Sequence, residues 1–126
     1  MNRSKFKIKA KTMFFTVVMT SMMLASCSTT KKVSILEYST PLPENTIVDV
    51  IGIGQKVPEG ARLLGHVKIG DSGFSVNCTY DKVIASAQTQ ARSIGGNLLQ
   101  ITKHKTPNIL TSTCHRIEGD VYFIKK

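Results

Sequence analysis

The first 27 residues most constrain what this chain can fold into, because they have the pattern of a segment that is removed from the mature protein. Residues 1–12 carry five of the 17 basic residues and no acidic one, and residues 13–25 (MFFTVVMTSMMLA) form an apolar run. A basic region followed by a short apolar region is the order of a secretory signal. A helix of these 13 residues is about 20 Å long, whereas the hydrocarbon core of a bilayer is about 30 Å thick. The pattern therefore predicts a signal peptide over residues 1–26 and not a permanent membrane span.

Removal of this segment changes the size and charge of what has to fold. The remaining 100 residues hold 12 Lys and Arg against 8 Asp and Glu, a net charge of +4. A chain of this length forms one small domain, since domains usually contain about 100–150 residues. It is too short for two domains or for enzyme folds built from two barrels. Because no acid–base pair or oriented nucleophile can be assembled from the sequence, we expect a protein that is not an enzyme and needs no cofactor.

The four residues from Leu24 to Cys27 (LASC) follow the apolar run directly. They resemble the bacterial lipoprotein box at all four positions. The resemblance implies that the thiol of Cys27 receives a diacylglyceryl group, that cleavage occurs just before this residue, and that the new amino terminus is acylated. Several acyl chains on one residue exceed what stable anchoring requires, so we expect the protein to fractionate with membrane. An ordinary secretory signal with a chance cysteine is the alternative.

The residues after the predicted anchor bear on location. Ser28 stands where an Asp, by resemblance to lipoprotein sorting in Gram-negative bacteria, would signal retention in the inner membrane. The run from Ser28 to Lys32 (STTKK) also differs from the acidic run that resembles a surface-export signal. The resemblance therefore implies an outer-membrane lipoprotein that faces the periplasm.

The segment from Cys27 to Asn45 has the composition of a linker, with hydroxylated residues and two prolines. We expect a lipid anchor and short tether over 27–45 and a single folded domain over 46–126. The apolar residues within 33–36 interrupt this composition. They leave open the alternative that this stretch forms a short edge strand or docks on the domain.

The rest of the chain predicts strands around one helix. Residues 46–54 are nearly all apolar, which favours a strand buried on both faces, and residues 61–69 alternate, with Leu64 on the outward side together with His66 and Lys68. Two further strands are expected at 97–103 and 115–125. The order strand, strand, helix, strand, strand indicates an α+β fold with a mostly antiparallel sheet of about four strands.

The helix is expected over residues 79–94, where apolar residues recur at helical spacing. Thr79 or Asn77 can serve as its N-cap, and Gly95 is placed to end it in a left-handed conformation. Small alanines in the apolar stripe allow the helix to lie close to a sheet.

Two short motifs in this region carry a second resemblance. The helix end runs from Ala91 to Ile101 (ARSIGGNLLQI), and Cys114 precedes Gly119 to Tyr122 (GDVY). These motifs resemble small envelope-lipoprotein domains related to the outer-membrane sensor of the Rcs phosphorelay, over about residues 63–123. The resemblance implies an α+β domain in which a disulfide fastens the helix start to the sheet. The sensor carries more cysteines and a longer tether, so its signalling is not carried over.

Cys78 and Cys114 are the only thiols left once Cys27 is acylated, and an exported protein enters an oxidising space. One disulfide between them is the simplest interpretation. The alternative is a redox-active or metal-binding pair, although the chain has no Cys-x-x-Cys motif.

Metal binding has four weak candidates, which share ligand chemistry but no recognised spacing. They are His66, His104, Cys114 and His115. His66 and His104 fall on solvent-facing strand positions or strand ends, so we expect no metal site. A metal-binding or thiol-active envelope protein remains the alternative function.

The basic residues of the mature chain are scattered, and an exported protein meets little nucleic acid, so no nucleic-acid partner is expected. Lys31 and Lys32 could touch anionic headgroups, and Lys103 to Lys105 could pair with an anionic glycan or a protein. The sequence thus predicts a non-catalytic, disulfide-bonded interaction or sensing module, held at the membrane by its N-terminal lipid and contacting another envelope component.

Overall fold

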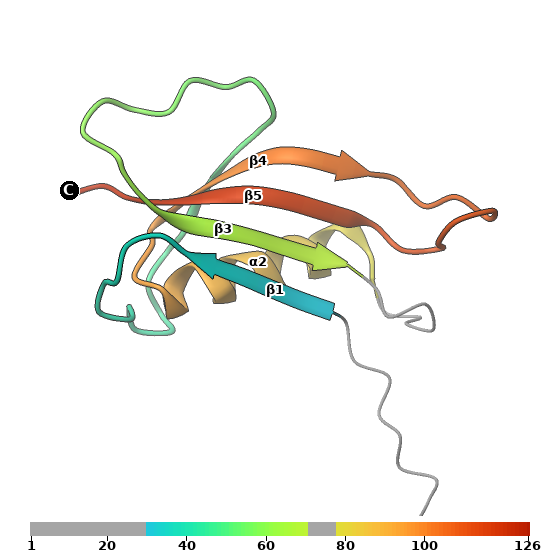
Figure 1. Cartoon of the computed structure of the whole chain (residues 1–126), viewed down its shortest axis with the longest axis horizontal. Coiled ribbons are helices and arrows are strands. Elements are labelled where there is room, and N and C mark those ends of the chain that lie inside the picture. Colours follow the sequence, from blue (N-terminus) through green and yellow to red (C-terminus); the bar gives the residue numbers. More distant parts are fainter. Residues whose placement is uncertain (1–29, 71–77) are drawn as a thin grey trace, which may run out of the picture.

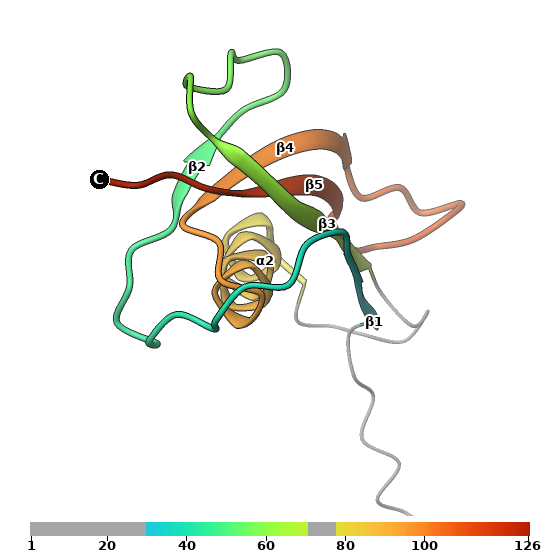
Figure 2. The same cartoon turned by 60° about the vertical axis from the view of Figure 1, so that its left-hand side comes forward.

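One sheet and one helix form the described part of the protein, a computed structural model that covers residues 30–70 and 78–126 (Figure 1). The elements in chain order are β1 (Thr30–Ile35), β2 (Asp49–Ile51), β3 (Arg62–Gly70), α2 (Tyr80–Ser93), β4 (Leu98–Lys105) and β5 (Arg116–Phe123). The helix packs on one face of the sheet, as seen in Figure 2, where the view runs nearly along the helix axis. The predicted α+β class is confirmed. The predicted signal peptide over residues 1–26, Cys27, Ser28 and Asn77 lie outside the described residues.

The sheet has the strand order β1-β3-β5-β4-β2. The pairs β1–β3, β3–β5 and β4–β5 are antiparallel, whereas β2 runs parallel to β4. The prediction of about four mostly antiparallel strands is therefore wrong in detail, because the sheet is mixed and has five strands in its described part. A parallel partner for β4 arises because α2 and the preceding strand β3 separate β2 from it, which gives the chain room for a crossover.

The extra strand is β1, at the edge of the sheet. It pairs with β3 from Thr30 opposite Gly70 to Ile35 opposite Gly65, and Val33 packs against the core. Of the two interpretations of segment 27–45, the edge strand is thus the one observed for its first described residues. The following residues also contact the fold, since the N–H of Leu42 donates a 2.9 Å hydrogen bond to the carbonyl of Arg92. In its described part this segment is not a free tether.

β2 is shorter and less buried than predicted. Only three residues pair with β4, and although Val48 is buried, Ile47 is 75 % and Ile53 61 % exposed. The expectation of a strand buried on both faces is wrong because the strand lies at the sheet edge. The chain leaves the sheet after Ile51 and turns at Gly54, which adopts a φ of 77°.

A β-bulge in β3 changes which residues reach the core. The register shifts between Leu63 and Gly65, so that Leu64 is completely buried instead of facing outward as predicted. A bulge inserts one residue into the strand and so reverses the alternation of side chains. Beyond the bulge His66 and Lys68 are exposed, as expected.

The helix is present almost as predicted. Val83, Ala87, Ala91 and Ile94 are buried against the sheet. Thr79 is the N-cap residue but makes no side-chain capping bond, and Gly95 follows the helix with a φ of 87°. The helix is too short and too polar to cross a bilayer, and it is the one helix of the described ranges.

Candidate functional site

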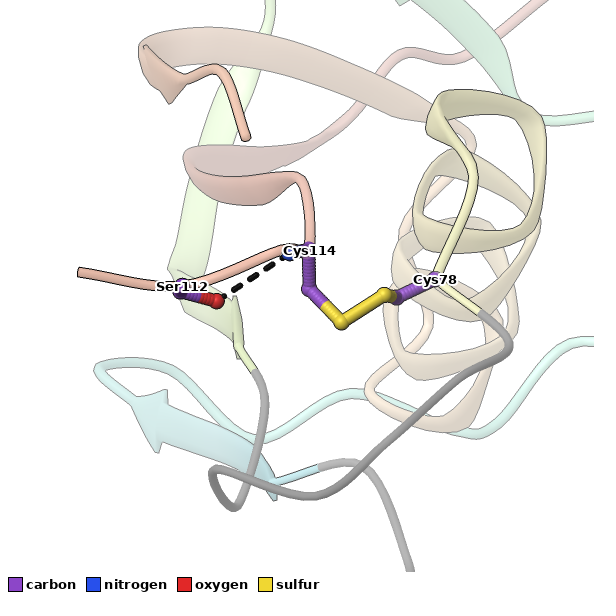
Figure 3. Close-up of a disulfide and its surroundings, with 3 residues drawn as sticks. All are labelled: Cys78, Ser112 and Cys114. Carbon is purple, nitrogen blue, oxygen red and sulfur yellow. Dashed lines mark hydrogen bonds between the residues drawn. A yellow bond between two sulfur atoms is a disulfide. The ribbon is translucent and has the colours of Figure 1, made fainter. Parts of the chain in front are cut away.

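A disulfide joins the start of the helix to the sheet. Cys78 precedes α2 and Cys114 precedes β5, and their Cα atoms lie 5.1 Å apart (Figure 3). The N–H of Cys114 donates to the hydroxyl of Ser112 at 3.1 Å, and the N–H of His115 donates to the carbonyl of Cys78 at 3.2 Å. The predicted pairing is confirmed. Because both sulfurs are bonded, the structure does not favour the thiol-active alternative.

Two of the predicted metal candidates meet beside this disulfide. The Nε2 of His104 lies 2.9 Å from the Nδ1 of His115, and the ring of Tyr80 lies 4.9 Å and 5.8 Å from these two rings. One imidazole donates and the other accepts, which requires at least one of the two to be neutral. His104 is half-buried rather than solvent-facing, because the register shift between Ile101 and Lys103 reverses the alternation near the end of β4. Sequence reasoning missed the contact with Tyr80.

The other two metal candidates do not join this pair. His66 lies on the open face of the sheet, where its Nδ1 is 2.5 Å from the carboxylate of Asp120, and Cys114 is bonded to Cys78. Within residues 30–70 and 78–126, no three His, Cys, Asp or Glu side chains are grouped to hold a metal ion. The four candidates therefore form no common site.

The face of the sheet opposite α2 carries charged side chains in rows across the strands. Strand pairing places Lys32 of β1 opposite Lys68 of β3, Lys68 opposite Glu118 of β5, and Glu118 opposite Lys103 of β4. Two residues further along β4, Lys105 lies opposite Arg116 of β5, toward the end of the sheet at which β1 begins. Directly opposed side chains have Cβ atoms about 5 Å apart. The rows thus bring together basic residues that are far apart in the sequence.

We call this group the basic patch, and its members share one end of the open sheet face. They are Lys32, Lys68, Lys103, Lys105 and Arg116. A small cavity of about 80 Å³ is lined by all of them except Lys32, which lines a neighbouring hollow together with Thr30, Lys68 and Arg116. Like charges directly opposite one another destabilise a sheet. Two such pairs occur here, Lys32 with Lys68 and Lys105 with Arg116.

Among the described residues, only one carboxylate forms an ion pair with a member of the patch. The Nζ of Lys68 lies 2.9 Å from Oε1 of Glu118. The hydrogen bond from Lys68, with the charges of Lys103 and Lys105, lowers the pKa of Glu118 below its ordinary value of 4.5, although burial acts in the opposite direction. The depressed pKa shows that the surroundings of Glu118 are positive.

Arg116 is not neutralised by a carboxylate of the described residues. Its Nη2 makes a long contact of 3.5 Å with the hydroxyl of Thr111, and its buried Nε has no hydrogen-bond partner there. Sequence reasoning had singled out Lys103 to Lys105 but missed Lys68 and Arg116. Their alternation along the strands was visible in the sequence, whereas the cross-strand neighbours that join them depend on the sheet order.

A second polar group lies on the same sheet face, near the end of β5 away from Arg116. Tyr122 is half-buried and its hydroxyl lies 3.4 Å from Oε1 of Gln100. Burial, with the nearby charge of Asp120, raises the pKa of Tyr122 above its ordinary value of 10.0. This phenol therefore stays neutral at physiological pH and acts as a hydrogen-bonding group.

Neither a protein-family model, nor a curated protein, nor a solved structure matches this chain. A functional assignment therefore depends on the residues and geometry described above.

Proposed function

We propose that this protein is a lipid-anchored lipoprotein of the bacterial outer membrane, facing the periplasm, that acts without catalysis as an interaction or sensing module. The order of basic region, apolar region and Leu24 to Cys27 box carries the proposal. The box resembles that of bacterial lipoproteins at four of four positions. Ser28, which differs from the inner-membrane retention signal, supports the outer membrane as its destination.

The fold is compatible with work close to the membrane. β1 begins at Thr30, three residues after Cys27, and continues directly into the sheet. A domain attached in this way must stay close to the membrane surface. A tether of 18 residues would instead allow a distance of up to about 60 Å. The open, charged sheet face is the surface it offers to another envelope component.

The disulfide supports the same assignment. A bond between Cys78 and Cys114 fits a protein that folds in an oxidising compartment outside the cytoplasm. It also supplies stability to a domain whose mature chain has only two Phe, three Tyr and no Trp. A metal-binding function has no comparable support in the described residues.

Replacement of the proposed lipid site tests the anchor. In Cys27→Ala we expect residue 27 to carry no acyl mass. We also expect the protein to leave the outer-membrane fraction, because the acyl chains that hold it there are absent. The measurements are mass spectrometry of the amino-terminal peptide and density-gradient fractionation of membranes. Wild-type protein without acyl mass would contradict the proposal.

Two further variants sharpen this test. The double variant Cys78→Ser/Cys114→Ser keeps Cys27 and should retain the acyl mass, which separates lipidation from loss of a cysteine in general. Ser28→Asp should move acylated protein toward the inner-membrane fraction. An unchanged distribution of Ser28→Asp would contradict the proposed sorting but not the anchor.

A further inference from the structure

Among the described residues, the two most exposed large apolar side chains lie at the end of the sheet that carries the basic patch. Ile109 and Leu110 occupy the loop between β4 and β5 and are 96 % and 91 % exposed. Figure 1 shows this loop extending beyond the sheet at the same end at which β1 begins. The register agrees, since Lys105 and Arg116 are the last pair of β4 and β5 before the loop.

The loop holds these apolar residues in a defined turn. The N–H of Asn108 donates to the carbonyl of Ser112 at 2.7 Å, and the side chain of Asn108 accepts a bond from the N–H of Leu110 at 2.9 Å. Cys114 follows this turn in the chain. Its disulfide with Cys78 ties the base of the loop to the start of the helix. An apolar tip on a fastened loop, with cations just behind it, is the arrangement that suits the boundary between acyl chains and headgroups.

The chain upstream of β1 limits where the membrane can be. Cys27 precedes Thr30 by three residues, so their Cα atoms cannot be more than about 11 Å apart at 3.8 Å for each residue. If Cys27 carries the lipid, the end of the sheet with Thr30, the basic patch and the loop tip must face the bilayer. The cations of the patch then lie at the depth of the lipid phosphates.

We infer that this end of the domain docks on the leaflet that holds the anchor, with Ile109 and Leu110 entering the interface and the basic patch binding the phosphate groups of anionic phospholipids. The inference rests on the proposed function, since the lipid on Cys27 sets which end faces the bilayer. Docking explains why opposed cations such as Lys105 and Arg116 are placed together at a cost to the sheet. The occupant is a phospholipid surface rather than a soluble anion, because exposed apolar residues adjoin the cations.

Lysine acetylation of the full acylated chain in vesicles tests the inference at single residues. The chain is reconstituted in phosphatidylcholine alone or with one-third phosphatidylglycerol, and acetylation rates are read by mass spectrometry. We expect rates at Lys32, Lys68 and Lys105 to fall about fivefold in the anionic vesicles, as a lysine held at an anionic surface implies. Lys56 is the matched control, because it is exposed in the segment between β2 and β3, which Figure 1 shows at the end of the sheet away from the loop tip. Its rate should change little.

Two sets of variants separate docking from general attraction to the vesicle. Ile109→Ser/Leu110→Ser should abolish most of the protection of Lys105, since each buried apolar side chain changes the docking equilibrium by about tenfold or more. Ile47→Ser/Ile53→Ser removes two exposed apolar side chains that flank β2, outside the proposed docking surface. This variant should leave the protection of Lys105 intact. Lys68→Gln/Arg116→Gln should likewise reduce the protection of Lys32 and Lys105, whereas Lys56→Gln/Lys125→Gln, which removes two exposed charges away from the patch, should not.

Each outcome has one meaning. Equal protection of Lys56 and Lys32, or no difference between the two vesicles, would overturn the inference. Protection by inorganic phosphate in phosphatidylcholine vesicles, with none from phosphatidylglycerol, would assign the patch to free phosphate and also overturn it. The same digest reports the acyl mass at Cys27, so a chain that lacks the lipid reveals failure of the proposed function separately from failure of docking.

Discussion

Glu118 shows how one residue reports the character of the surface around it. It is the one acid of the described residues that forms an ion pair with a member of the basic patch, Lys68. Such exposed pairs contribute little to folding, about 0.2–1 kcal/mol, because water screens them. Since Glu118 balances only one of the neighbouring cations, the patch keeps an excess of positive charge that an anionic surface can satisfy.

The titration of Glu118 tests this description. We expect its pKa, measured by NMR of the side-chain carboxyl group, to lie below 4.5 in the folded protein and to rise toward 4.5 in Lys68→Gln, which removes the largest cause of the shift. A lowered pKa adds stability above pH 4.5 that is lost as the pH falls through the folded-state value. The effect on unfolding is small because the side chain is 38 % exposed. A wild-type pKa at or above 4.5, or an equal shift in Lys56→Gln, would contradict the account.

At the scale of elements, the position of β1 depends on a close approach between two backbones. A Cβ on Gly65 would lie within 2.3 Å of the carbonyl oxygen of Ser34 in β1, which no side chain tolerates without movement of the backbone. Glycine at this point therefore allows the edge strand to pair beside the β3 bulge. The same strand places Lys32 next to Lys68, so the basic patch depends on this contact.

Gly65→Ala should therefore loosen β1. We expect a loss of about 1–3 kcal/mol in the free energy of unfolding, as for other overpacked sites, together with faster hydrogen exchange of the β1 amides. Gly70→Ala is the control on the same strand, because the one described atom that its Cβ would meet is Cγ of Arg116, at an ordinary distance of 3.9 Å. Equal behaviour of the two variants in urea unfolding and exchange would show that the close approach is unimportant.

At the scale of the whole molecule, the disulfide joins the two layers. It connects residues 36 positions apart and fixes the helix start against the beginning of β5 and the base of the apolar loop. The core itself is built from aliphatic side chains of both layers, among which Leu64, Ile69, Leu99 and Ile117 are almost completely buried. A small core of this kind gains much from a covalent link.

The double variant Cys78→Ser/Cys114→Ser measures this contribution without leaving a lone thiol. The chain-entropy model gives about 3–4 kcal/mol for a closed loop of this length, so we expect Tm to fall by more than about 10 °C in a domain of this size. Calorimetry of the oxidised wild type and the variant checks it, and reduced wild type should behave like the variant. An unchanged Tm would show that the two layers hold together without the bond.

Local patterns were sufficient for much of this protein. The apolar stripe of α2, Gly95 at its end and the cysteine pair could be predicted because each depends on neighbours in the chain or on simple counting. The failures have a shared cause. The bulges near Leu64 and Thr102, the edge position of β2 and the recruitment of 30–35 into the sheet depend on which strand lies alongside, and residue periodicity carries no such information.

The sequence by itself was enough to predict the α+β class and the cysteine pair, which the structure confirms, and a leader with a lipoprotein box, which stay predictions, since all of these depend on composition and short-range spacing. Only the tertiary structure decided that Lys32, Lys68, Lys103, Lys105 and Arg116 share one end of a sheet face, and that Ile109 and Leu110 extend from that same end. The physical reason is strand order. Side chains from four strands become neighbours through the hydrogen-bonded pairing of a sheet, whose order β1-β3-β5-β4-β2 differs from the order of the chain.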